Sequence, residues 1–296
     1  SLDFYLKNTY DLLAVIDVPA GVNFKNEILT NVGSMTNRGF EFEFNAIAIQ
    51  KKDLQLDLGA NVTMNQNEVT KLTKVADSNN VGILTGGISG AGIGNNVQVH
   101  SVGYPTNSFY VFEQLYDDEG NPLEDQFADL NGDSIPNQDD RYHYKQAAPQ
   151  MYLGFYGNLR YKQWSVGFNL RSEVGRYIYN NVRSSRAYYN AIPSQNFLVN
   201  LNEDFLEDQI IQTTTNQTLS DHYVERADFL RMDYFNVGYD FGKIWNERMS
   251  LRVGAAVNNV FLLTTYSGLD PEISTGIDNN FYPRPRIYSF NLNLTF

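Results

Sequence analysis

The most constraining feature of this sequence is a strict alternation of apolar and polar residues. From Leu54 to Asn65 the even positions carry Leu, Leu, Leu, Ala, Val and Met, and the odd positions carry Gln, Asp, Gly, Asn, Thr and Asn. At the chain's 42% hydrophobic content, such a pattern arises by chance with a probability on the order of 10⁻⁴. A period of two predicts a β-strand with one face toward an apolar medium and the other toward water or polar groups.

Similar alternation recurs along the chain and ends in the last strand, Tyr288 to Phe296. We predict about ten strands, near residues 2–14, 37–49, 53–69, 96–104, 108–117, 150–161, 164–180, 222–241, 249–262 and 285–296. The connections between them alternate in length. Long ones span 15–36, 70–95, 118–149, 181–221 and 263–284, and short ones span 50–52, 105–107, 162–163 and 242–248.

Composition narrows the class of protein. A formal net charge of -12 and a pI of about 4.7 argue against nucleic acid as a partner, because binding phosphates requires clustered Lys and Arg. Cysteine is absent, which excludes disulfides, cysteine-based zinc sites and thiol catalysis. The longest apolar run, 12–16, is far shorter than the roughly 20 residues of a membrane helix. The aromatic content of 14% is compatible with either a membrane or a soluble β-protein.

The loop lengths decide between these two. Outer-membrane barrels combine short periplasmic turns with long extracellular loops, whereas a soluble sandwich has no reason to alternate its connections in this way. The sequence therefore predicts an all-β fold, a transmembrane antiparallel β-barrel. Tyr161 and Trp164, which flank a short turn, are predicted to lie in an interfacial aromatic girdle, with Tyr177 and Tyr179 toward the other end of the same strand.

Several segments, in order along the chain, resemble SusC-type (RagA-like) TonB-dependent transporters of Bacteroidetes outer membranes. Residues 103–110, Gly-Tyr-Pro-Thr-Asn-Ser-Phe-Tyr, are similar to the family's Gly-x-Pro-x-Gly-Ser-Phe-Tyr segment, with Asn107 where glycine is usual. Residues 129–133, Asp-Leu-Asn-Gly-Asp, followed by Asp-Asp-Arg at 139–141, resemble its acidic loop. The remaining similar segments are 31–41, 229–232, 258–261, 266–272 and 282–286.

The resemblance implies that residues 1–296 are the C-terminal portion of a receptor barrel of 22 strands in the outer membrane, and that the plug domain lies outside this chain. It also implies partners: the remaining barrel and plug, TonB acting through the N-terminal part, membrane lipid, and a SusD-type surface lipoprotein that covers the extracellular loops. The implied activity is import of oligosaccharides or peptides, driven through TonB by the proton gradient. No bond is made or broken, so the chain is not expected to be an enzyme.

One loop carries a candidate metal site. Calcium prefers six to eight oxygen ligands, and a twelve-residue loop supplies them at positions 1, 3, 5, 7, 9 and 12. The matching positions here are Asp129, Asn131, Asp133, Ile135 (through its carbonyl), Asn137 and Asp140. The match to an EF-hand loop is imperfect, because Ser134 replaces the usual glycine and Asp140 replaces the bidentate glutamate. A loop rich in Asx turns explains the same composition without a cation.

The sequence shows no catalytic signature. The three histidines, His100, His143 and His222, are too far apart for metal-ligand spacing. Two alternatives to the transporter remain open at this point: a self-contained passive porin of about ten strands, and a soluble secreted β-sandwich such as a carbohydrate-binding module. The sandwich predicts that the apolar faces pack against each other in a core.

Overall fold

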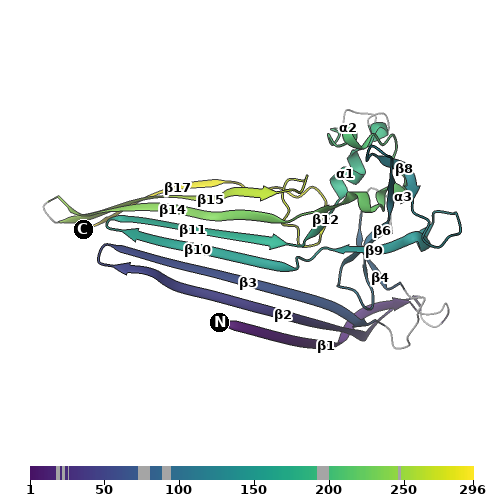
Figure 1. Ribbon diagram of the computed structural model, residues 1–296, viewed down its shortest axis with the longest axis horizontal. Helices are drawn as coiled ribbons and strands as arrows, with labels where there is room; N and C mark the ends of the chain where they lie inside the picture. The colour runs from purple at the N-terminus through teal and green to yellow at the C-terminus, as the bar shows by residue number, and fades with distance from the viewer. Residues whose placement is uncertain are drawn as a thin grey trace.

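The computed structural model describes residues 1–17, 21, 24–25, 27–72, 81–88, 95–191, 200–245 and 248–296. Its main element is an antiparallel sheet of eight long strands (Figure 1). In spatial order the strands are β1 (Leu2–Asp17), β2 (Glu27–Lys51), β3 (Leu54–Lys71), β10 (Met151–Tyr161), β11 (Trp164–Val174), β14 (Phe229–Ile244), β15 (Met249–Thr264) and β17 (Ile287–Thr295).

The remaining elements gather at one end of this sheet, on the right in Figure 1, and we call them the end subdomain. Its strands are β4 (Ile83–Gly87), β5 (Asn96–His100), β6 (Ser108–Phe112), β7 (Gln114–Tyr116), β8 (Pro122–Phe127), β9 (Arg141–Gln146), β12 (Tyr177–Asn180), β13 (Val224–Arg226) and β16 (Ile277–Asp278). Its helices are α1 (Asn181–Arg186), α2 (Phe205–Asp208) and α3 (Thr215–Thr218), with 3₁₀ turns η1 (Gln138–Asp140), η2 (Tyr189–Ala191) and η3 (Asp221–Tyr223). At the opposite end of the sheet the connections within the described ranges are short turns, such as 162–163.

The long sheet has two chemically distinct faces, as the alternation predicted. Cross-strand register aligns one apolar row across the sheet: Phe44, Ala60, Phe155, Leu170, Met232 and Phe261. The next row points to the other side and is mostly polar: Asn45, Gly59, Tyr156, Asn169, Tyr234 and Asn258. Gly59 is required there, because a Cβ at this position would lie 2.1 Å from the Tyr156 ring. The Tyr156 hydroxyl donates to Asn45 Oδ1 at 2.7 Å.

The buried core lies in the end subdomain and not under the sheet. Its centre is formed by fully buried side chains, among them Val97, Phe109, Phe112, Tyr179 and Leu219. The apolar face of the sheet is exposed by contrast: Phe4 is 75% exposed and Phe290 is 86% exposed. The apolar faces of the long strands therefore do not pack against each other, which contradicts the β-sandwich alternative. No helix in the described ranges is long and apolar enough to span a membrane.

The number of sheet strands is a correction to the prediction, because eight strands and not ten form the long sheet. The predicted strands 96–104 and 108–117 belong to the end subdomain, where β5 and β6 pair with β4 and β9. All five residues of β6 are buried. A strand covered on both faces reads as a continuous apolar run, and such a run was mistaken for a membrane strand.

Two of the predicted strands are each divided into two shorter strands in the structure. The predicted strand 164–180 breaks after Val174, where Gly175 takes a φ of +76° and the chain turns into β12. Tyr179 lies in β12 and is fully buried, so it is not part of a membrane girdle. Residues 222–241 likewise divide into β13 and β14. Tyr161 and Trp164 are cross-strand partners in one row at the short-turn end of the sheet. The Trp164 ring packs edge-on against the Tyr239 ring, with 4.8 Å between their centroids.

The predicted loop 15–36 is largely strand, because β2 starts at Glu27 and runs for 25 residues. Between residues 27 and 38 both sides of this strand mix polar residues, such as Asn31, Ser34 and Asn37, with apolar ones such as Leu29 and Val32. A strand that continues beyond the apolar medium no longer needs an apolar face. The alternation that identifies strands therefore disappears although the hydrogen-bonded ladder with β1 continues.

Candidate functional site

The acidic loop brings its predicted residues together. Carboxylate oxygens of Asp129, Asp133 and Asp140 lie within 4.8 Å of one another. Asn131 Nδ2 donates to Asp133 Oδ2 at 3.1 Å. Asn137 Nδ2 donates to the Ile135 carbonyl at 3.0 Å. All six predicted oxygen donors thus belong to one compact loop between β8 and β9.

Backbone N–H groups hold this loop in shape. Asp129 accepts from the N–H groups of Gly132 at 2.6 Å and Ser134 at 2.8 Å. Asp140 is buried and accepts from the N–H of Asn137 at 2.9 Å and from that of Leu130 at 3.0 Å. These N–H groups, Asn137 foremost, lower the pKa of Asp140 below its usual value in spite of its burial.

Ser134 explains why the imperfect motif still forms the turn. Its φ is +60°, so serine adopts the left-handed conformation for which the EF-hand pattern uses glycine. The contacts in the loop are equally those of consecutive Asx turns. The calcium site therefore stays a prediction.

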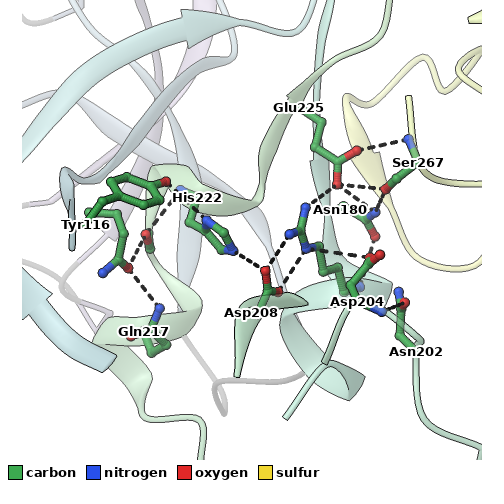
Figure 2. Close-up of polar contacts among 12 residues, drawn as sticks. Tyr116, Asn180, Asn202, Asp204, Asp208, Gln217, His222, Glu225 and Ser267 are labelled. Atoms are coloured by element: carbon green, nitrogen blue, oxygen red, sulfur yellow. Dashed lines mark hydrogen bonds and ion pairs between the residues drawn. The ribbon is translucent and has the colours of Figure 1, made fainter. Parts of the chain in front are cut away.

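A second polar cluster ties the end subdomain together around Arg183 of α1. Figure 2 labels its partners Asp204, Asp208 and Glu225. Arg183 Nε donates to Asp208 Oδ2 at 3.0 Å, and its other guanidinium nitrogens face Asp208 and Glu225. Asp204 lies 3.6 Å from Arg183 Nε. The guanidinium thereby links α1, α2 and β13, three elements distant in sequence.

The cluster continues through His222, whose Nε2 lies 3.0 Å from Asp208 Oδ1 and whose Nδ1 lies 3.1 Å from the Tyr116 hydroxyl. Burial would raise the pKa of Asp208, but the hydrogen bonds from His222 and Arg183 outweigh it and lower that pKa. Burial, followed by the nearby charge of Asp221, raises the pKa of Tyr116 to about 12. The Tyr–His–Asp contacts join β7, η3 and α2 within the end subdomain.

On its other side the cluster reaches the connection between β15 and β17. Asn180 Nδ2 donates to Glu225 Oε1 and to Ser267 Oγ, both at 3.0 Å. Ser267 Oγ donates in turn to Glu225 Oε1 at 2.9 Å. The connection 265–286 is therefore fixed to the end subdomain.

The same connection is also fixed to the polar face of the long sheet. Arg231 of β14 is 1% exposed and donates to Asp270 Oδ1 at 2.7 Å, while its Nε lies 3.2 Å from Glu272. Arg171 of β11 donates to both oxygens of Glu272, and Arg284 lies 2.8 Å from the same carboxylate. Burial would raise the pKa of Glu272, but the hydrogen bonds and charge of Arg171, with the other arginines, lower it. We call this group the arginine clamp.

Sequence reasoning did not predict the arginine clamp. The sequence did contain a signal for it, because Arg171 and Arg231 are charged residues on the polar faces of alternating strands. Three segments of the family resemblance, 229–232, 266–272 and 282–286, each contribute to it. Connecting them required the fold, which brings β11, β14 and residue 272 together.

No protein-family model matches the sequence. The chain is 37% identical over 301 residues to the TonB-dependent receptor SusC of Bacteroides thetaiotaomicron, a match that covers all of this chain and 30% of that protein. It is 24% identical over 330 residues to the TonB-dependent receptor P3 of Formosa agariphila, covering all of this chain and 32% of that protein. Its fold matches a chain of the RagAB peptide importer with a TM-score of 0.73 and 25% identity, over all of this chain and 33% of the other.

The two-faced sheet and these similarities point to one class of protein, the TonB-dependent receptors. Within that class the chain is similar over its whole length to SusC. It spans about a third of the length of the relatives that it matches. The predicted resemblance and the all-β fold class with long antiparallel strands are thus confirmed.

Proposed function

We propose that residues 1–296 are the C-terminal portion of an outer-membrane receptor barrel that imports oligosaccharides or peptides with energy delivered through TonB. The observation that carries the proposal is the sheet itself: one continuous apolar face, one polar face, and similarity to SusC over the entire chain. RagAB is named as a peptide importer, which supports peptides as one of the two proposed classes of cargo. The relatives are named as receptors and an importer, which supports transport and not catalysis.

In this proposal the apolar face contacts lipid and the polar face lines the lumen, where the plug of the same receptor sits. The end subdomain gathers the long connections and forms the extracellular surface. A SusD-type lipoprotein would cover that surface. The arginine clamp and the Arg183 cluster hold its loops in one arrangement against the barrel, so that a lid meets a preformed surface.

Uptake by whole cells tests the proposed function. Deleting the gene for the full receptor is expected to reduce uptake of its labelled oligosaccharide or peptide cargo by roughly tenfold or more, because large polar solutes do not cross the membrane unaided. Collapsing the proton gradient is expected to do the same in the parent strain. Cargo uptake that persists without the gradient would identify a passive porin instead.

We also propose that the acidic loop binds calcium on the extracellular side, through Asp129, Asn131, Asp133, Ile135, Asn137 and Asp140. The support is the convergence of the three carboxylates and the left-handed turn at Ser134.

Calorimetry on the purified full receptor tests the calcium site. Asp133→Ala removes one charged ligand and is expected to weaken calcium binding by roughly tenfold or more. Asp117→Ala is the matched control, since Asp117 is an exposed aspartate that accepts from the N–H of Glu119 and Asn121 in a separate turn. Equal calcium affinity in the parent and Asp133→Ala, or no binding in either, would contradict the proposal.

A further inference from the structure

The apolar face of the sheet has an upper limit, marked by one charge. The lowest row, at the short-turn end, is Lys51, Leu54, Tyr161, Trp164, Tyr239, Val253 and Leu292. The highest apolar row is Phe4, Phe40, Met64, Met151 and Val174. The next row above it is Leu6, Arg38 and Gln66. No paired residue on this face is charged between the lowest row, which contains Lys51, and the row that contains Arg38.

The spacing of these rows fits a bilayer. From Leu54 to Met64 the strand rises about 34 Å, which corresponds to about 25 Å along the membrane normal at the usual strand tilt. That is the height of the apolar band of outer-membrane barrels. Arg38 therefore lies on the lipid-facing side, at the level where the hydrocarbon gives way to headgroups.

Beside Arg38 the surface is hollowed into a groove of about 880 Å³. Its floor and walls include the highest apolar row, Phe4, Phe40, Met64, Met151 and Val174, together with Leu6 beside Arg38. Its upper end is polar, with Arg38, Gln66, Gln146 and Gln150. The groove arises because β10 starts at Met151, whereas β3 continues beyond Met64 to Lys71. The sheet is therefore locally incomplete at this level.

The Arg38 guanidinium retains donors toward the groove. Its Nε donates to Gln66 Oε1 at 3.0 Å, which fixes the plane of the group. Arg38 is exposed and forms no ion pair with any carboxylate in the part of the chain that the structure describes. A planar guanidinium with two free terminal nitrogens matches two oxygens of a phosphate.

We propose that this groove binds one phosphate-bearing lipid of the membrane, with its phosphate on Arg38 and an acyl chain along the apolar rows beneath. Charge and shape both favour this ligand. The cation at the polar end attracts an anionic headgroup, and the apolar floor, which continues into the lipid-facing surface, can contact an acyl chain. The proposal rests on the proposed placement of this face in the membrane, and it adds a specific lipid site to that placement.

Native mass spectrometry of the delipidated full receptor in detergent tests the site. Dimyristoyl phosphatidylglycerol is expected to bind with one strong site, whereas dimyristoylglycerol, which has the same chains and no phosphate, and inorganic phosphate are expected to bind at least roughly tenfold more weakly. Lipid A in place of phosphatidylglycerol identifies which phosphate-bearing lipid the site prefers, and tight binding of either supports the proposal. Dimyristoylglycerol that binds as tightly as phosphatidylglycerol would overturn it.

Two variants and one control locate the site. Arg38→Gln is expected to reduce phosphatidylglycerol affinity by roughly tenfold, through loss of the charge-assisted pair. Val174→Trp, which fills the groove and keeps the charge, is expected to reduce it as well. Lys51→Gln removes the cation at the opposite rim of the same face and is expected to leave binding unchanged. Unchanged binding in Arg38→Gln contradicts the proposal even if the receptor still transports its cargo, so the two proposals fail separately.

Discussion

Residues 1–296 expressed alone are not expected to form the compact, heat-modifiable species that marks a folded outer-membrane barrel. In the long sheet β1 and β17 stand at the two ends, and each pairs on one side only among the described strands. β1 has 16 residues and β17 has nine, so both free edges are long rows of unpaired N–H and C=O groups. Each such group costs several kcal/mol in hydrocarbon, and the total far exceeds the roughly 5–15 kcal/mol by which domains are stable.

Gel migration before and after boiling measures this outcome. The fragment is expected to migrate identically in both states, whereas co-expression with the remaining part of the receptor, which supplies partners for both edges, is expected to restore the faster unboiled band. The control is the full receptor, with all segments in one chain. A clean folded band from the fragment alone would show that these eight strands can close on themselves, and that the chain is a complete small barrel.

The membrane-facing part of the fold was predictable because lipid imposes a simple rule on sequence. Every residue on one side of a strand must be apolar, as Leu54, Leu56 and Leu58 illustrate, so the pattern of β3 is visible without knowledge of its neighbours. The rule applies only within the apolar band. Where β2 continues above it, from Glu27 to Thr36, no alternation remains and the strand was predicted as a loop.

The end subdomain follows another rule, which local sequence does not reveal. β6 is buried on both faces, and its covering residues, such as Leu219 and Tyr223, lie more than a hundred positions along the chain. A short apolar run in such a strand is identical in composition to part of a membrane strand, so its partners alone determine its place.

The candidate sites divide in the same way. The acidic loop was predictable because its donors alternate within twelve positions, from Asp129 to Asp140, and local backbone hydrogen bonds fold it. The arginine clamp was not predictable, because Arg171, Arg231 and Glu272 come from three separate segments. Their proximity depends on the register of β11 with β14 and on the path of a long connection.

Arg231→Ala is expected to release the connection 265–286 from the barrel wall of the full receptor. Arg231 is almost completely buried and faces Asp270 and Glu272, which are themselves largely buried. Removing one member of a buried ion pair leaves an uncompensated charge and costs about 3–5 kcal/mol. If the connection opens locally, this corresponds to a rise in its open population of roughly two to four orders of magnitude.

Limited proteolysis of the full receptor measures this opening, because cleavage follows the population of the open state when opening and closing are fast. The matched control is Arg226→Ala. Arg226 pairs with Asp228 at 2.6 Å, but its side chain is 63% exposed, and exposed ion pairs contribute only about 0–1 kcal/mol. Cleavage between residues 265 and 286 should therefore accelerate strongly in Arg231→Ala and hardly at all in Arg226→Ala. Similar cleavage rates in both variants would mean that Ser267 and the Arg183 cluster hold the connection without the arginine clamp.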